Sequence, residues 1–137
     1  LNWYNLILDI KTKANSHEDL EFAFILFCMA SLYLKSDLLE LSLAACERAL
    51  SLIYDIKGLE SIDCIPALNV MCSVFYKTKN YQESLKYASK SLEIILNCYG
   101  PDSMEFITLL TNIGSIFYQM NSIEDALVFF GKSLSIL

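Results

Sequence analysis

The residues that could carry out chemistry in this sequence are one histidine, five cysteines and a recurring set of acidic side chains. His17 has only Glu18 and Asp19 beside it, and a metal or catalytic site needs partners that this stretch lacks. The cysteines are odd in number and contain no Cys-x-x-Cys pair and no histidine at zinc-ligand spacing. They are Cys28, Cys46, Cys64, Cys72 and Cys98. We therefore predict free thiols, no metal and no cofactor.

The acidic residues are the other candidates, because paired carboxylates can act as general acids and bases or bind calcium. They fall where helices are expected to begin, and negative charge there offsets the helix dipole and caps free N–H groups. This structural role is the interpretation we favour for Glu18, Asp19, Glu21, Glu60, Asp63, Asp102 and Glu105. Glycine-rich nucleotide-binding, zinc-protease and serine-hydrolase motifs are also missing from the sequence. We predict that the chain is not an enzyme.

Composition and charge exclude several classes of protein. Of the 137 residues, 55% are hydrophobic and 19% are charged, which is too apolar for a disordered chain. The net charge of −6 and the scattered lysines argue against nucleic acid as a partner. The longest strongly apolar stretch, Phe22 to Leu34, is shorter than the ~20 residues that cross a membrane. Free thiols favour a cytoplasmic location, and a start without methionine indicates a part of a longer protein.

A repeat of 42 residues organises the sequence. Leu26, Leu68 and Leu110 are spaced by this interval, and the same spacing relates large apolar or aromatic residues along most of the chain. Three further sets of equivalent positions hold small residues, which let helices approach closely. These sets are Ala30, Cys72 and Gly114; Ser42, Ser84 and Ala126; and Ala49, Ser91 and Ser133. A period of this length predicts stacked supersecondary units with a shared core.

Each unit is predicted to be a hairpin of two amphipathic helices, so the fold class is all-α. Polar turns at Ser36–Asp37, Lys79–Asn80 and Asn121–Ser122 would join the two helices of each hairpin. Gly58 and Gly100 suit helix C-terminal caps, and Asp102 with Glu105 suggests a capping box. The expected helices span 1–12, 19–35, 38–57, 60–78, 81–98, 102–120 and 123–137. They form one array with a leading helix at 1–12 and repeats at 19–57, 60–98 and 102–137.

The order of large, small and aromatic positions resembles the tetratricopeptide repeat. The last unit carries the resemblance most fully, at Leu110, Ile113–Gly114, Phe117, Ala126, Phe130 and Ser133. The usual unit has about 34 residues, and the longer spacing here is similar to that of kinesin light chains. Leu1 to Ile10 aligns with the second helix of a preceding, truncated unit. The resemblance implies a superhelical solenoid of antiparallel hairpins with a concave groove lined by the first helices.

The same resemblance implies which side chains face this groove. They are Phe24, Phe27, Ser31, Lys35, Asn69, Ser73, Tyr76, Lys77, Asn112, Ser115, Tyr118 and Gln119. The family's clamp for a C-terminal carboxylate uses lysine, asparagine and arginine at positions that hold Phe27, Ser31, Val70, Thr108 and Asn112 here. Only Asn112 could serve, and without cations the carboxylate would bind weakly, so we reject that function. The expected function is a non-catalytic, adaptor-like scaffold that binds a protein or peptide in the groove.

An alternative function remains open at this stage. The chain could be a structural or self-association segment of a larger protein, which could itself be an enzyme. Self-association would use the uncapped C-terminal helix, where Val128, Phe129, Leu134 and Leu137 are expected to leave an apolar surface uncovered.

Overall fold

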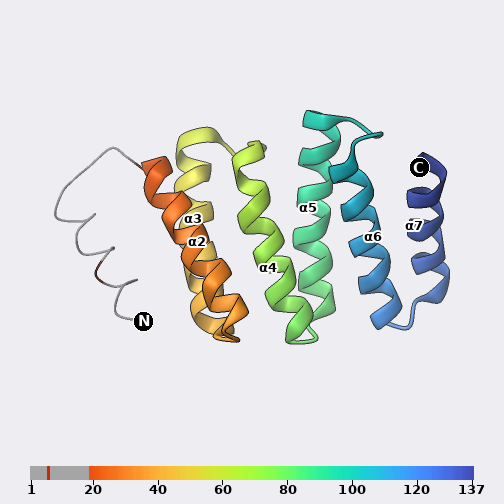
Figure 1. The fold of residues 1–137 in the computed structure, drawn as a ribbon, viewed down its shortest axis with the longest axis horizontal. Coiled ribbons are helices and arrows are strands. Elements are labelled where there is room, and N and C mark those ends of the chain that lie inside the picture. Colours follow the sequence, from red (N-terminus) through yellow and green to blue (C-terminus); the bar gives the residue numbers. More distant parts are fainter. Residues whose placement is uncertain (1–5, 7–18) are drawn as a thin grey trace. The chain divides into compact units, whose positions relative to one another are not determined.

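A computed structural model describes residue 6 and residues 19–137, and the described residues are helical with no β-strand (Figure 1). The elements are α2 (Asp19–Lys35), α3 (Leu39–Lys57), the 3-10 helix η1 (Ile62–Cys64), α4 (Ile65–Lys77), α5 (Tyr81–Tyr99), α6 (Met104–Gln119) and α7 (Ile123–Ile136). The helix expected at 1–12 lies outside the described residues except for Leu6, and His17 lies outside them as well. The prediction of an all-α fold is confirmed.

The chain divides into two compact units, Leu1–Val70 and Met71–Leu137. The first unit contains α2, α3, η1 and the start of α4. The second contains the end of α4 and helices α5 to α7. Within the first unit α2 packs against α3, and within the second α6 packs against both α5 and α7.

The turns and caps repeat with the same 42-residue interval as the sequence. Asp37, Lys79 and Asn121 have left-handed backbone conformations with φ of 62°, 64° and 63°. Gly58 and Gly100 end α3 and α5 with φ of 91° and 90°, which favours glycine. The predicted turns and glycine caps are therefore confirmed.

Two helix starts differ from the prediction. The capping box expected at Asp102 and Glu105 is wrong, because the N-cap of α6 is Ser103, whose Oγ accepts a hydrogen bond from the N–H of Phe106 at 3.2 Å. The helix expected from residue 60 begins instead as η1, where Ser61 Oγ accepts from the N–H of Asp63 at 3.1 Å. In both places a serine caps the helix and the neighbouring carboxylates do not.

Small side chains at the predicted positions bring the two helices of a hairpin together. Ser42 is fully buried in α3 and donates a hydrogen bond from Oγ to the carbonyl oxygen of Ala30 in α2 at 2.8 Å. Ser84 in α5 makes the equivalent bond to the carbonyl of Cys72 in α4 at 2.9 Å. Each serine therefore links the two helices of its hairpin by a direct hydrogen bond as well as by close approach.

The third hairpin has no hydrogen bond at the equivalent position, and its α6 and α7 are joined instead at Ser133, whose Oγ lies 3.4 Å from the carbonyl oxygen of Ile107. The equivalent residues are Gly114 and Ala126, which have no side-chain donor. A Cβ atom at Gly114 would lie 2.8 Å from Cε1 of Phe130 in α7, so any larger residue at this position would force the ring to shift. In the set of small positions formed by Ala49, Ser91 and Ser133, Ser91 of α5 is fully buried, and its Oγ has no hydrogen-bond partner among the described residues.

A stack of two aromatic rings and a lysine recurs in the second unit. The rings of Phe75 and Tyr87 stack with centroids 5.6 Å apart, and Nζ of Lys90 lies 5.4 Å from the Tyr87 centroid. One repeat later, Phe117 stacks on Phe129 at 5.4 Å, with Nζ of Lys132 5.4 Å from Phe129. Each stack joins the first helix of a hairpin to the second, so these aromatics stabilise the hairpins.

Candidate functional site

In the first unit, the side chains expected to face a groove lie along one side of α2. Phe24, Phe27, Ser31 and Lys35 are separated by three or four residues, which places them on one helix face. Phe24 is 65% exposed, and Phe27 and Ser31 are partly exposed. The rings of Phe24 and Phe27 lie 6.3 Å apart. Asn69 in α4 is exposed as well.

In the second unit, the corresponding side chains lie on α4 and α6. Asn112, Ser115, Tyr118 and Gln119 occupy one face of α6, and Tyr118 is 58% exposed. The opposite face of this helix is buried. Ser73 and Lys77 on α4 are exposed, and Tyr76 is partly exposed.

Tyr76 and Ser115 make contacts within the second unit. The ring of Tyr76 packs edge-on against Tyr81 of α5, with centroids 5.6 Å apart. Ser115 Oγ donates to the carbonyl oxygen of Thr111 at 3.2 Å, so its proton is used within the helix while its lone pairs stay available.

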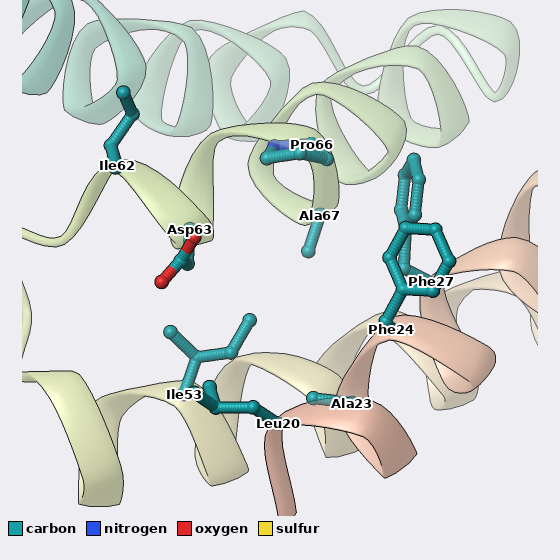
Figure 2. Close-up of a pocket in the computed structure, with 9 residues that line it drawn as sticks. All are labelled: Leu20, Ala23, Phe24, Phe27, Ile53, Ile62, Asp63, Pro66 and Ala67. Atoms are coloured by element: carbon teal, nitrogen blue, oxygen red, sulfur yellow. The ribbon is translucent and has the colours of Figure 1, made fainter.

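The first unit contains a hollow of about 290 Å³ that is lined almost entirely by apolar side chains (Figure 2). Its walls come from α2, the end of α3, η1 and the first turn of α4. The lining residues are Leu20, Ala23, Phe24, Phe27, Ile53, Ile62, Asp63, Pro66 and Ala67. Phe24 and Phe27 are the only two of them that the sequence placed at a binding surface.

The hollow exists because two alanines occupy positions that hold larger residues in the other repeats. The residues equivalent to Ala23 are Ile65 and Ile107. The residues equivalent to Ala67 are Ile25 and Leu109. Ala23 and Ala67 both line the hollow, so the missing methyl and methylene groups leave it unfilled. This difference between the repeats is the sequence signal that could have located the hollow.

Asp63 is the one charged residue that lines the hollow. Its Oδ2 lies 3.5 Å from Ser61 Oγ, and no lysine or arginine in the described part of the chain forms an ion pair with it. Figure 2 shows its carboxylate on the side of the hollow away from Phe27. Sequence analysis assigned Asp63 to helix capping and missed this position.

Three cysteines have pKa values that depart clearly from their ordinary value. Burial, with a smaller contribution from the negative charge of Glu47, raises the pKa of the Cys46 thiol to about 12. Burial also raises the pKa of Cys72 and of Cys64. All five cysteines are free, and the described residues contain no group of histidine, cysteine and acidic side chains that could hold a metal ion. None of the described helices is long and apolar enough to cross a membrane.

Helical hairpins with this spacing of small and aromatic positions define an all-α repeat protein of the tetratricopeptide class. The model of the tetratricopeptide repeat family matches residues 63–137, and the chain belongs to this family. Members of the family generally mediate protein–protein interactions, and the fold is typically a non-catalytic scaffold.

The fold also resembles a solved structure. A crystal structure of BtubC (BKLC) from P. vanneervenii superposes with a TM-score of 0.84 and 19% sequence identity over 97% of this chain. The match covers 54% of the BtubC chain, so this chain spans about half the length of that protein. No curated protein matches the sequence at a significant level.

Proposed function

We propose that this chain is a non-catalytic, adaptor-like module that binds a protein or peptide on the face formed by its first helices. The proposed contact residues are the twelve side chains of α2, α4 and α6 named above. A cytoplasmic location is part of the same proposal. Membership of a family that generally binds proteins or peptides supports it.

The observation that carries the proposal is that α6 has one buried face and one solvent-accessible face. Its buried side, including Leu110, Ile113 and Gly114, faces away from solvent. Asn112, Ser115, Tyr118 and Gln119 stay accessible and include an exposed aromatic ring. Exposed tyrosines are enriched among the residues that dominate binding energy at interfaces, because they bury a large area at a small entropy cost.

We expect the chain to select peptides from a phage library of random twelve-residue sequences. Tyr118→Ala is expected to weaken the binding of a selected peptide by about tenfold, because an interface tyrosine contributes more than about 1 kcal/mol. Fluorescence polarisation with the labelled peptide measures this change. Leu127→Ala on α7 is the matched control, since this exposed side chain lies on a second helix, and it should leave affinity unchanged. Equal affinity for wild type and Tyr118→Ala would remove Tyr118 from the proposed contact surface, and failure to select any peptide would argue against the function.

A second candidate function, self-association, is favoured by the exposure of α7. Leu134 is 72% exposed, whereas the equivalent Leu50 in the first repeat is 5% exposed. Leu137 is likewise exposed, whereas the equivalent Ile53 and Ile95 are buried. Val128 is exposed too, and Phe129 is partly covered by its stack on Phe117. A large exposed apolar surface of this kind favours association with another chain.

If α7 mediates self-association, the protein should sediment as a larger species as its concentration rises. Leu134→Glu combined with Leu137→Glu is expected to weaken this association by about tenfold or more, since burying one leucine contributes about 1.5–3 kcal/mol. Ser135→Glu, at an exposed polar position of the same helix, is the control for added charge. Monomeric wild-type protein at high concentration in sedimentation velocity would argue against this second function.

A further inference from the structure

We propose that the hollow of the first unit, bounded by α2, α3, η1 and α4, holds an apolar side chain of a partner peptide whose neighbouring residue is lysine or arginine. This inference rests on the proposed function and specifies the chemistry of one part of the partner. Leu20, Phe24, Phe27, Ile53 and Ile62 would contact the apolar side chain, and Asp63 would pair with the cation.

The size and lining of the hollow favour a single side chain as its occupant. Its volume of about 290 Å³ is at the lower limit of small-molecule pockets, which hold about 300–1,000 Å³. Phe24 and Ile62 at its edge are exposed to solvent. Removing such large apolar side chains from water is favourable, so an occupant that covers them would gain binding free energy. An inserted leucine, methionine or phenylalanine would bury these edges together with the walls, as an anchor residue does in a peptide groove.

The charge at the hollow favours a basic neighbour for this anchor. Asp63 is the only ionisable lining residue, and its carboxylate has no cationic partner within the described part of the chain. A cation beside the anchor would gain a charge-assisted hydrogen bond to Asp63, whereas an acidic neighbour would be repelled.

The test uses the full chain and the random twelve-residue phage library. We expect the selected peptides to be enriched in an apolar residue next to lysine or arginine. Changing that basic residue to glutamate in the strongest selected peptide should weaken binding by about tenfold. Asp63→Asn should weaken binding of the unchanged peptide by about threefold, as expected for one exposed ion pair, and less at high salt.

A pocket-filling variant tests the apolar part. Ala67→Leu introduces the residue that the third repeat holds at Leu109 and should fill the hollow while preserving the helical circular dichroism. This variant is expected to bind the selected peptide at least about tenfold more weakly than the wild type does. Phe24→Ala, at a position that is 65% exposed, gives a second measurement with an expected loss of about fivefold.

The outcomes separate this inference from the proposed function. If the Ala67→Leu, Phe24→Ala and Asp63→Asn variants each bind the selected peptide more weakly than the wild type, the inference is supported. Selected peptides that are weakened by Tyr118→Ala but not by these three variants would overturn the inference and leave the proposed function standing. Equal affinity for the basic and glutamate peptides would also overturn the inference. Failure to select any peptide would overturn both.

Discussion

Replacing Gly114 with valine is expected to lower the free energy of unfolding by about 2–3 kcal/mol, because the added side chain has no space in the third hairpin. The first added atom alone would lie 2.8 Å from Cε1 and 2.9 Å from Cδ1 of Phe130. Either the ring or the whole of α7 must then move away from α6. Urea unfolding followed by circular dichroism measures the loss.

Two further variants assign this loss to the contact with Phe130. Gly114→Val combined with Phe130→Ala should lose less stability than the sum of the single changes, by at least about 1 kcal/mol, since the second change removes the obstacle. Gly131→Ala on α7 is the control for glycine in a helix. A Cβ atom there meets nothing within 4 Å, so alanine should stabilise by up to about 1 kcal/mol through helix propensity. Additive losses in the double variant would show that Phe130 is not the cause.

Much of the fold followed from the 42-residue interval. Equivalent large residues predicted the helix faces, and equivalent small residues predicted the close contacts between helices. Gly114 shows the strength of this inference, because a missing side chain at that position indicated a close approach before the contact with Phe130 was known. The start of α4 was less accessible to prediction. Pro66 and the acidic residues before it suit either an α-helical or a 3-10 first turn, and the choice depends on packing against α3.

The candidate site was predicted less completely than the fold. The resemblance to tetratricopeptide repeats identified helix faces, and these faces keep exposed side chains such as Phe24 and Tyr118. It could not indicate the hollow, because family positions describe what repeats share, whereas the hollow results from two alanines that differ from the other repeats. It also could not place Asp63, whose position at the hollow depends on η1.

The buried thiol of Cys46 is expected to make stability fall as pH rises above 9. Its pKa is about 12 in the folded chain against an ordinary value of 9.0, because burial disfavours the thiolate. The unfolded chain therefore releases this proton at lower pH, and the stabilising contribution is complete below pH 9 and is lost as pH rises toward 12. At pH 10.5 the loss should be about 2 kcal/mol relative to pH 8.

Comparison with Cys46→Ala isolates this contribution, since the two proteins differ only at this side chain. Urea unfolding at pH 8 and pH 10.5 should show a smaller decrease in the variant, by about 2 kcal/mol. In native protein at pH 8, a thiol reagent such as DTNB should modify exposed Cys98 rapidly. Cys46 should be modified only after unfolding, because its thiolate fraction is about a thousandfold below that of an ordinary thiol and its sulfur is buried. Equal pH dependence in both proteins, or rapid labelling of Cys46 in the native state, would show that α2 and α3 do not hold this thiol away from water.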